Sequence, residues 1–300
     1  MNPLAADPVQ ISVVIVTYNS HRDLVTALPA LRAAMQDVRY RICLVDNAST
    51  DGTQEFLQRQ QQSLPELLLI LNDLNRGYTA AVNQGLRRVG NADFVLLLNP
   101  DVIIPPTTMP ILLQELQQDG RIGLIAPQMR YPNGRIQPSC RRFPRQRDVF
   151  LELFPDQWLR TICPRLADWK MTDFDHRSSR WVDQPPGAFF LIRNQALQQV
   201  GLLDERFFMF FSDVDYCQRL VRLGWKIRFC ADTFVYHQGG SSVNRNKAKM
   251  IVTSHRSFVD YFLKYQPGGV QKFGIVVVTV WLLILLLPRL LWARLRANQW

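Results

Sequence analysis

The sequence predicts an α/β protein built on a Rossmann-like, doubly wound and mostly parallel sheet with helices on both faces. Over residues 1–130, short apolar runs rich in β-branched residues alternate with stretches of helical period. The runs are apolar at nearly every position, as expected of strands that are buried on both faces. Polar residues follow several runs directly, at the sheet edge where ligands of such folds bind.

Strands and helices are expected to alternate throughout this first half. Ser20 can cap the first helix, in which Leu24, Leu28 and Leu31 share one face. The expected strands are Ile11–Thr17, Arg41–Val45, Leu67–Leu71, Phe94–Leu98 and Ile122–Ala126. The expected helices are His21–Met35, a helix that begins at Asp51 or Thr53, Gly77–Val89 and Thr107–Asp119.

The second half begins with an irregular segment. Residues 131–184 are rich in Pro, Arg and Trp and are expected to form loops with short helices. Regular structure is expected to return after this segment, and Gly224 is suited to end a helix. The expected elements are a strand at Gly187–Arg193, helices at Gln195–Val200 and Asp213–Leu223, and strands at Trp225–Cys230 and Thr233–Tyr236.

The C-terminal region contains an apolar segment. Phe273–Leu287 carries no charge but is shorter than the roughly 20 residues that span a bilayer. A core helix of a soluble protein is one interpretation. We favour a membrane-associated segment over residues 270–300, because Val, Leu and Ile occur all round the predicted helix and Trp281 and Trp292 can anchor it at an interface. It either spans the bilayer, with Leu290–Trp292 included, or enters one leaflet.

The charge of the chain is unevenly distributed. The sequence holds 35 Lys and Arg against 25 Asp and Glu, and 47% apolar residues, which excludes a largely disordered chain. Residues 216–300 hold 13 basic residues against 2 acidic ones, a balance of +11, so the excess surrounds the apolar segment. We expect this surface to dock on anionic lipid headgroups. A basic nucleic-acid-binding protein is the rival interpretation, and we expect no nucleic-acid partner.

The cysteines and the N-terminus indicate a reducing compartment. None of the five cysteines forms a CxxC pair, so neither a zinc site nor a disulfide framework is expected. Residues 1–9 are expected to be a tail, and Met1–Gln10 lacks the apolar core of a signal peptide. The folded part is therefore expected in the cytosol. The cysteines are Cys43, Cys140, Cys163, Cys217 and Cys230.

The residues after the first strand exclude one common function of doubly wound folds. Dinucleotide-binding proteins carry Gly-x-Gly-x-x-Gly at this position. This chain has Thr17-Tyr-Asn-Ser-His-Arg22 there, without a glycine. We therefore exclude an NAD-binding site at this edge.

Eight segments in order resemble the family 2 glycosyltransferases, enzymes of the GT-A fold that use nucleotide-sugar donors. Cys140–Pro144 is similar to a segment of the bacterial rhamnosyltransferase-type branch. The resemblance covers about residues 10–265 and implies one GT-A domain, with a nucleotide-binding half at 10–130 and an acceptor and catalytic half at 131–265. The eight segments are Val13–Asn19, Val45–Thr53, Asn75–Gly85, Leu97–Val102, Gly187–Arg193, Val200–Leu220, Gly224-Trp225 and Val235–Ser242.

The resemblance implies a donor site at the ends of the first two strands. Asp46 is expected to accept a hydrogen bond from the donor base, and capping of the following turn is its alternative role. Thr17, Tyr18, Asn19 and Asn47 are expected beside the base and ribose. Asn19 is equally suited to a turn.

The third helix is expected to border the donor. Gly77 opens this helix and is small enough for a close backbone approach. Asn83 lies further along the same helix, in the family's Asn-x-Gly pattern. Packing of the helix on the core is the alternative explanation for Asn83.

A divalent metal is implied by the segment after the fourth strand. Asn99-Pro100-Asp101 stands where the family carries Asp-x-Asp, so one negative charge is missing. The resemblance implies that Asp101 is the main ligand of Mg²⁺ or Mn²⁺, a Lewis acid for the leaving diphosphate, and that Asn99 contacts ribose or a metal-bound water. His237 matches a family histidine that joins the metal or the diphosphate, and a structural role is its alternative.

The catalytic base is implied by an acidic segment in the second half. Ser212-Asp213-Val214-Asp215 stands where the family reads Glu-Asp-x-Asp, so Asp213 aligns with the base that takes the acceptor proton. Asp215 is the second candidate for the base. Both can also be helix N-terminal acids favoured by the dipole, and Asp215 is expected to pair with Arg219 four residues on.

A basic run precedes this region. Arg141, Arg142, Arg145 and Arg147 are expected either to be solvated loop residues or to grip the diphosphate of a donor or of a polyprenyl-linked acceptor. Phe143 lies within this basic run.

These residues predict an inverting, metal-dependent glycosyltransferase at the cytoplasmic face of the bacterial inner membrane. The expected donor is dTDP-L-rhamnose, or otherwise a UDP-hexose or UDP-HexNAc, and the expected acceptor is a hydroxyl of a lipid-linked or polysaccharide cell-envelope precursor. Because Asn99 and Ser212 replace acids, a catalytically inactive nucleotide-sugar binder is a second hypothesis. A nucleotidyltransferase is a third, but the N-terminal region lacks a Gly-rich pyrophosphate loop with Lys.

Overall fold

The computed structural model describes residues 10–151, 169–239, 247–266 and 268–297, and it confirms the predicted α/β fold. The strands are β1 (Gln10–Thr17), β2 (Arg39–Asp46), β3 (Leu67–Leu71), β4 (Phe94–Leu98), β5 (Val102–Ile103), β6 (Ile122–Arg130), β7 (Arg180–Trp181), β8 (Phe189–Arg193) and β9 (Lys226–His237). The helices are α1 (His21–Ala34), α2 (Thr53–Ser63), α3 (Tyr78–Leu86), α4 (Thr108–Gln118), α5 (Gln146–Leu151), α7 (Asn194–Val200), α8 (Ser212–Arg222), α10 (Lys247–Tyr265) and α11 (Gly269–Ala297).

Within the described ranges the strands form one nine-stranded sheet in the order β3-β2-β1-β4-β8-β6-β9-β5, with β7 beside β9. The strands β3, β2, β1 and β4 are all parallel, as predicted for the first half. Strand β8 is antiparallel to both β4 and β6, so the second half of the sheet is mixed. The two strands expected at the end of this half are one continuous strand, β9, with a register irregularity against β6 near Pro127.

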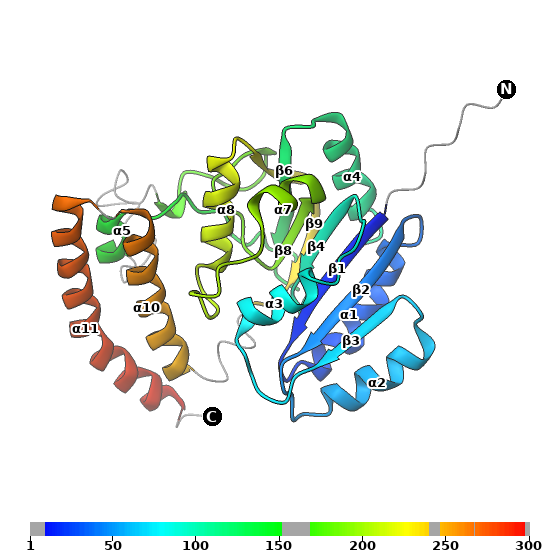
Figure 1. The fold of residues 1–300 in the computed structure, drawn as a ribbon, viewed down its shortest axis with the longest axis horizontal. Coiled ribbons are helices and arrows are strands. Elements are labelled where there is room, and N and C mark those ends of the chain that lie inside the picture. Colours follow the sequence, from blue (N-terminus) through cyan, green and yellow to red (C-terminus); the bar gives the residue numbers. More distant parts are fainter. Residues whose placement is uncertain (1–9, 152–168, 240–246, 267, 298–300) are drawn as a thin grey trace.

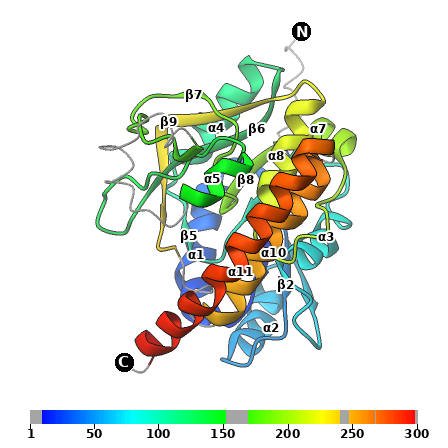
Figure 2. The ribbon, with the colours of Figure 1, turned by 90° about the vertical axis from the view of Figure 1, so that its left-hand side faces the viewer.

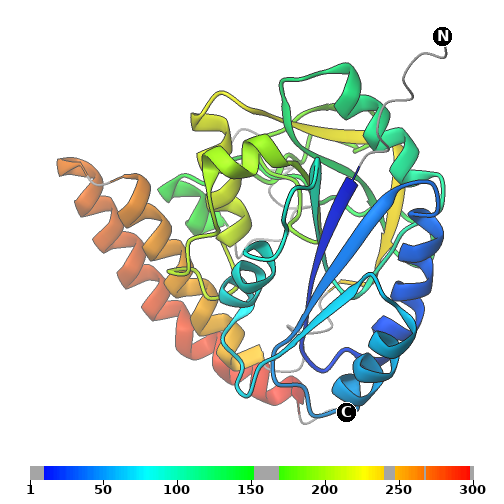
Figure 3. The ribbon, with the colours of Figure 1, turned by 45° about the vertical axis from the view of Figure 1, so that its right-hand side comes forward.

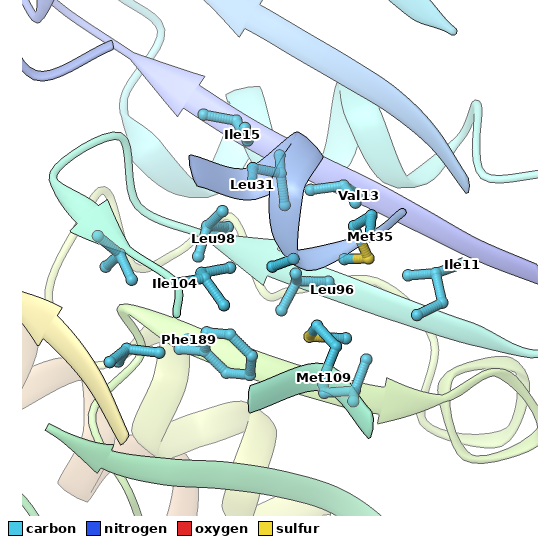
Figure 4. Close-up of a cluster of buried hydrophobic side chains, with 14 of the residues drawn as sticks. Ile11, Val13, Ile15, Leu31, Met35, Leu96, Leu98, Ile104, Met109 and Phe189 are labelled. Atoms are coloured by element: carbon cyan, nitrogen blue, oxygen red, sulfur yellow. The ribbon is translucent and has the colours of Figure 1, made fainter. Parts of the chain in front are cut away.

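Helices cover both faces of the sheet because successive strand residues point to opposite sides. Figure 3 shows α1 and α2 on one side of the sheet and α3 on the other. Ile11, Val13 and Ile15 of β1 belong to the first core, together with Leu31 and Met35 at the end of α1 (Figure 4). Val14 and Val16 belong to the second core, which includes residues of α3, α7 and α8.

A third core joins the C-terminal helices to the domain. Helices α10 and α11 form an antiparallel hairpin at one side of the molecule, next to α5 and α8 (Figures 1 and 2). Phe211 and Val214 of the α8 region pack in this core with aromatic residues of α10 and with Ile275 and Val278 of α11. The sequence did not predict α10, and α11 extends well beyond the expected apolar segment, through Pro288.

By length and composition, Gln271–Leu290 of α11 is able to cross a membrane, with a mean hydropathy of 2.4. Only 17% of this span is buried in the protein, which does not match the core helix of a soluble protein. Of the two expected aromatic anchors, Trp281 is partly buried in the third core. Trp292, like Cys163 and the expected tail at 1–9, lies outside the residues whose side chains are described.

Candidate active site

The carboxyl ends of β1, β2 and β4 bring the predicted polar segments together. Strand β1 lies between β2 and β4, and Thr17 is opposite Asp46 in the register of β1 and β2. Asn99 follows β4 directly, and its backbone N–H donates to the carbonyl of Ala188, just before β8. The site is therefore assembled at one edge by the parallel order of the strands, as predicted.

Asp101 and His237 meet because β5 pairs with the end of β9. Val102 is opposite His237 in this antiparallel pair, so the preceding Asp101 reaches the imidazole. The Asp101 Oδ2 atom lies 3.6 Å from His237 Nε2. Burial lowers the pKa of His237 below its usual range, although the Asp101 carboxylate acts in the opposite direction. A hollow of about 280 Å³ borders Asp101 and Tyr236 on this side.

The donor atoms of this pair fit a divalent cation. The Gln137 Oε1 atom lies 3.0 Å from His237 Nδ1 and can accept its proton, which leaves the Nε2 lone pair directed to the Asp101 side. A carboxylate oxygen and an imidazole nitrogen are ligands that Mn²⁺ accepts. Gln137 was not among the predicted residues, because its distance in sequence from His237 gives no signal.

A separate group of metal-binding residue types lies between α4 and the middle of β9. Glu115, Cys230 and Asp232 approach one another, but the Glu115 carboxylate already pairs with Arg228 Nε at 2.7 Å. Asp232 accepts a hydrogen bond from Ser179 Oγ at 2.6 Å. Existing protein partners therefore occupy these carboxylates.

Asp213 lies in the first turn of α8 against Gly187. A Cβ atom added at Gly187 would lie 2.9 Å from the Asp213 Cβ and 3.1 Å from its Oδ2, so a larger residue there would displace Asp213. Burial raises the pKa of the Asp213 carboxyl above its usual range, against backbone N–H groups of Val214 and Gly187 that lower it. The charge of Asp213 and burial together raise the pKa of Tyr78, at the start of α3.

The dipeptide Gly187-Ala188 connects the predicted base with the predicted metal segment. Gly187 contacts Asp213, and the Ala188 carbonyl accepts the N–H of Asn99 at 2.9 Å. Asp213 and the Asn99-Pro100-Asp101 segment therefore flank the same two residues. The structure therefore connects Asp213 and the segment that contains Asp101 through two adjacent residues, although Asp101 and Asp213 are more than a hundred residues apart in the sequence.

Asp215 does not have the surroundings of a base. Its side chain is fully buried, and its Oδ2 accepts from Arg219 Nε at 2.8 Å, which confirms the predicted helix pair. Its Oδ1 accepts from Tyr265 Oη at 2.6 Å and from Lys264 Nζ, both at the end of α10. Lys264 also contacts Asp204 Oδ2 at 2.7 Å. Asp215 thus connects α8 with α10, a structural role, and its second-choice role as a base stays a prediction.

Asp46, which is predicted to bind the nucleobase of the donor, already has hydrogen-bond partners within the protein. Asp46 is fully buried and accepts hydrogen bonds from the backbone and hydroxyl of Ser49 and from Gln54 Nε2 at 2.7 Å. Its alternative role as a cap of this turn is therefore present. Among the described residues the buried Thr17 Oγ1 atom has no hydrogen-bond partner, whereas Tyr18 is 39% exposed at the edge.

Asn19 and Asn47 shape the loops of this edge. Asn19 adopts a left-handed backbone with φ 53°, and its Oδ1 accepts from Thr50 N at 2.7 Å, as a turn residue does. Asn47 is buried and its side chain binds the 72–77 loop through Asn72, Asn75, and the backbone of Arg76 and Gly77. Both residues order backbone around the site, and their direct contact with a donor stays a prediction.

Asn83 and Gly77 face protein atoms and not an open donor site. The Asn83 amide is buried and donates to Leu203 O at 2.9 Å and Glu205 Oε1 at 2.8 Å, and its Oδ1 accepts from Leu203 N. Gly77 has φ 88°, and an added Cβ would lie 2.5 Å from the Phe208 ring. The close approach predicted for Gly77 is therefore to the 203–208 loop, and the contacts of Asn83 match its alternative packing role, while its donor contact stays a prediction.

One arginine of the basic run, Arg141, is bound by backbone carbonyl groups. Arg141 donates through its guanidinium to the carbonyls of Pro138, Cys140 and Lys170, so this side chain does not match the expected grip on diphosphate. Arg142 is half-buried, whereas Arg145 is exposed, which matches the solvated alternative for Arg145.

A buried histidine that the sequence did not single out positions this run. The His176 Nε2 atom accepts the N–H groups of Ser139 at 3.2 Å and Cys140 at 3.0 Å, and Nδ1 faces the carbonyl of Phe174. Burial lowers the pKa of His176, so the neutral ring that these bonds require is maintained. An isolated His in a Pro- and Arg-rich segment carries no periodic signal that could identify it.

Comparisons with known proteins relate the chain to a family of enzymes. Residues 12–201 match the model of the family described as Glycosyl transferase family 2. The chain is 30% identical over 256 residues to the N-acetylglucosaminyl-diphospho-decaprenol L-rhamnosyltransferase of Mycobacterium tuberculosis, which covers 82% of this chain and 81% of that protein. It is 32% identical over 112 residues, 36% of this chain and 34% of the relative, to the undecaprenyl-phosphate 4-deoxy-4-formamido-L-arabinose transferase of Photorhabdus laumondii.

Solved structures with the same fold are more distant in sequence. The mannosyltransferase PcManGT of Pyrobaculum calidifontis, solved with GDP-Man and Mn²⁺, superimposes with a TM-score of 0.57 at 19% identity. This match covers 99% of the present chain and 79% of PcManGT. At this identity the likeness concerns the fold alone.

Proposed function

The chain belongs to glycosyltransferase family 2 and has the GT-A fold, and on that premise we propose that it is an inverting enzyme that transfers L-rhamnose from dTDP-L-rhamnose to a hydroxyl of a lipid-linked cell-envelope precursor. The observation that carries this proposal is that Gly187 contacts Asp213 while the neighbouring Ala188 binds Asn99, two residues before the Asp101 that meets His237. The name of the mycobacterial relative supports both the sugar and the acceptor class. A UDP-hexose or UDP-HexNAc is the second donor, and a polysaccharide is the second acceptor.

Asp213 is the proposed general base. The acceptor hydroxyl gives its proton to the Asp213 carboxylate while its oxygen attacks the anomeric carbon, and the bond from that carbon to the diphosphate breaks. A carboxylate whose pKa is raised by burial takes a proton more readily than an exposed one. A single displacement with one base inverts the configuration of the anomeric carbon.

Asp101 and His237 are the residues that would hold Mg²⁺ or Mn²⁺, with Asn99 beside them. When bound, the cation supplies positive charge to the departing diphosphate. Gln137 keeps the His237 ring in the orientation that this role needs. Asn99 lacks the charge of the acid usually found there, so Asp101 supplies most of the negative charge at the site.

The donor base is proposed to bind beside Thr17, Tyr18 and Asp46. Gln54 Nε2 occupies Asp46 Oδ2 in the present state, so a base N–H would replace Gln54 as the donor of this hydrogen bond. The unpartnered Thr17 hydroxyl lies opposite Asp46 in the strand register and offers a second polar group. Ribose is proposed to lie toward Asn19 and Asn99.

A binding screen and a transfer assay test this function. Melting temperatures are measured with dTDP-L-rhamnose, UDP-N-acetylglucosamine and GDP-mannose, each with and without Mn²⁺, because a ligand at 100 times its Kd stabilises the fold by about 2.7 kcal/mol. Asp213→Asn is expected to abolish transfer and to retain the shift with donor, whereas the exposed Asp37→Asn serves as the matched control.

The outcomes separate the two main hypotheses. Full activity of Asp213→Asn would remove the base assignment. A donor shift without turnover in the unmodified protein would favour the inactive nucleotide-sugar binder, which the replacements at Asn99 and Ser212 suggest. No shift with any donor would reject the proposed donor classes.

The proposed location is the cytoplasmic face of the bacterial inner membrane. The apolar α11 helix and the basic C-terminal third support membrane association. A lipid-linked acceptor would be reached there.

A further inference from the structure

The outer face of α11 carries a continuous apolar stripe. Its residues are 41% to 65% exposed, and successive turns contribute one residue or an adjacent pair at intervals of three or four positions, so they lie on one side of the helix. Phe273 continues the stripe at its N-terminal end with 72% exposure. From Phe273 to Leu287 the stripe is about 21 Å long at the rise of a helix. The stripe residues are Val276, Val277, Val280, Leu283, Ile284 and Leu287.

The opposite face of α11 is attached to the protein along its length. Ile275, Val278 and Leu282 are at most 5% exposed and pack in the third core. Near one end of the helix, Gln146 Nε2 donates to the carbonyl of Gln271 at 3.0 Å. Near the other end, Arg289 contacts His255 Nε2 of α10 at 3.0 Å. Figures 1 and 2 show α11 beside α10 over most of its length.

Helix α11 cannot cross a bilayer while it is held in this way. Its partner α10 carries Lys249, Arg256, Asp260 and Lys264, and a spanning hairpin would move these charges into hydrocarbon. Release of α11 from α10 would instead expose the aromatic residues of the third core, which include Phe262. Both routes are unfavourable compared with a helix that stays attached and lies flat.

We propose that α11 lies in the plane of the membrane and inserts its apolar stripe into one leaflet, with the rest of the protein above it. Interfacial helices bury an apolar face at the boundary between headgroups and acyl chains in this way. The inference rests on the proposed membrane association and is independent of which sugar is transferred. It decides between the two arrangements that the sequence left open.

The composition of the stripe favours lipid over a protein partner. The six stripe residues are aliphatic, Phe273 at the end of the stripe is its one aromatic residue, and none of these side chains has a polar group that could pair across an interface. Protein interfaces are enriched in several aromatic residues and in Arg. Residues 216–300 carry a balance of +11, and Arg256 and Lys272 are exposed on the hairpin. Anionic headgroups are attracted to such a surface.

This orientation places the proposed site close to the bilayer. The Lys249 ammonium, near the start of α10, lies 5.0 Å from the ring centre of Phe208, and Phe208 packs on Gly77 at the start of α3. Helix α10, the partner of the inserting helix, is therefore in direct contact with a loop beside the active-site edge. A hydroxyl near a lipid diphosphate would lie within reach of that edge.

Vesicle flotation of the full chain tests the insertion. The probes are preformed vesicles of phosphatidylcholine alone and of phosphatidylcholine mixed with phosphatidylglycerol. The wild type is expected to float, more strongly with phosphatidylglycerol, and the double variant Val280→Glu/Ile284→Glu is expected to lose about tenfold or more of the bound fraction. Leu223→Glu changes an equally exposed apolar residue beside α8 and is expected to float like the wild type.

Further measurements distinguish a lost membrane contact from a lost fold, a spanning helix and a protein partner. Circular dichroism and the donor-induced melting shift show whether each variant is folded and binds donor. A variant that loses either signal has lost its fold or its donor site, and its flotation then says nothing against the membrane contact, whereas a variant that keeps both signals and no longer floats has lost the membrane contact itself. A cleavable C-terminal tag is expected to stay accessible to protease added outside the vesicles, and its protection would overturn the in-plane orientation in favour of a spanning helix. A wild type that does not float, or that is a dimer which the double variant dissociates, would overturn lipid as the occupant.

Discussion

Gly187→Ala is expected to slow sugar transfer without weakening donor binding. The added Cβ would lie 2.9 Å from the Asp213 Cβ, 3.3 Å from its Cγ and 3.1 Å from its Oδ2. The backbone φ of Gly187 is outside the left-handed region, so the substitution acts through this contact and not through backbone strain. The proposed base must therefore move.

The expected loss follows from the size of that movement. Ordinary van der Waals contact begins near 3.4 Å, so the Asp213 Cβ must retreat by about 0.5 Å. A displacement of 1 Å at a reacting group can cost about a hundredfold in rate. We therefore expect kcat to fall about tenfold, which corresponds to about 1.4 kcal/mol of activation free energy.

Steady-state kinetics with a matched glycine variant measure this effect. Gly120→Ala adds the same methyl group where nothing lies within 4 Å, and it is expected to retain the wild-type kcat. Whatever residual turnover Asp213→Asn retains should fall no further when Gly187→Ala is added, since both changes act on one group. A wild-type kcat for Gly187→Ala, or an equal loss in both backgrounds, would refute the reasoning.

Three further predictions concern the surroundings of the site. Asp215→Ala is expected to reduce the free energy of unfolding by about 3 kcal/mol in urea titrations, because Lys264 and Arg219 lose a buried carboxylate; a loss below about 1 kcal/mol would contradict the structural role. Folding lowers the pKa of His176 below its ordinary value of 6.5. The stability that its neutral ring contributes is therefore fully present above pH 6.5 and is lost as the pH falls below that value. Between about pH 8 and about pH 5.5, the free energy of unfolding should fall more for the wild type than for His176→Gln. Parallel plots of this free energy against pH for the two proteins would contradict the prediction. Asp101→Ala is expected to remove the Mn²⁺-dependent part of the donor-induced melting shift, and a retained dependence would place the cation elsewhere.

The strand and helix pattern could be predicted from local sequence because burial on both faces leaves a continuous apolar run. Ile11–Thr17 and Phe94–Leu98 were predicted within one residue of the observed β1 and β4. Helix α10 was missed because its apolar positions are interrupted by Lys249, Arg256 and Lys264, which face either solvent or a distant partner.

The site was predicted as a set of segments, and the structure divided their roles. Asp213 and Asp215 are two residues apart in one motif, and the sequence offered both as bases. One turn of α8 directs Asp213 to Gly187 and buries Asp215 against Lys264 and Tyr265, which come from a helix that the motif does not include. Asn83 is a similar case, since its partners at 203–205 lie far along the chain.

The sequence by itself determined the family, the fold class and the segments that form the active-site edge, because these depend on periodicity and on ordered motifs. Only the tertiary structure decided that Asp101 meets His237, that Asp215 joins two helices, and that one face of α11 is covered while the other is exposed. These features depend on the pairing of side chains from distant elements. A hydrogen bond or a buried contact requires atoms within a few ångströms, and the folded chain alone sets those distances.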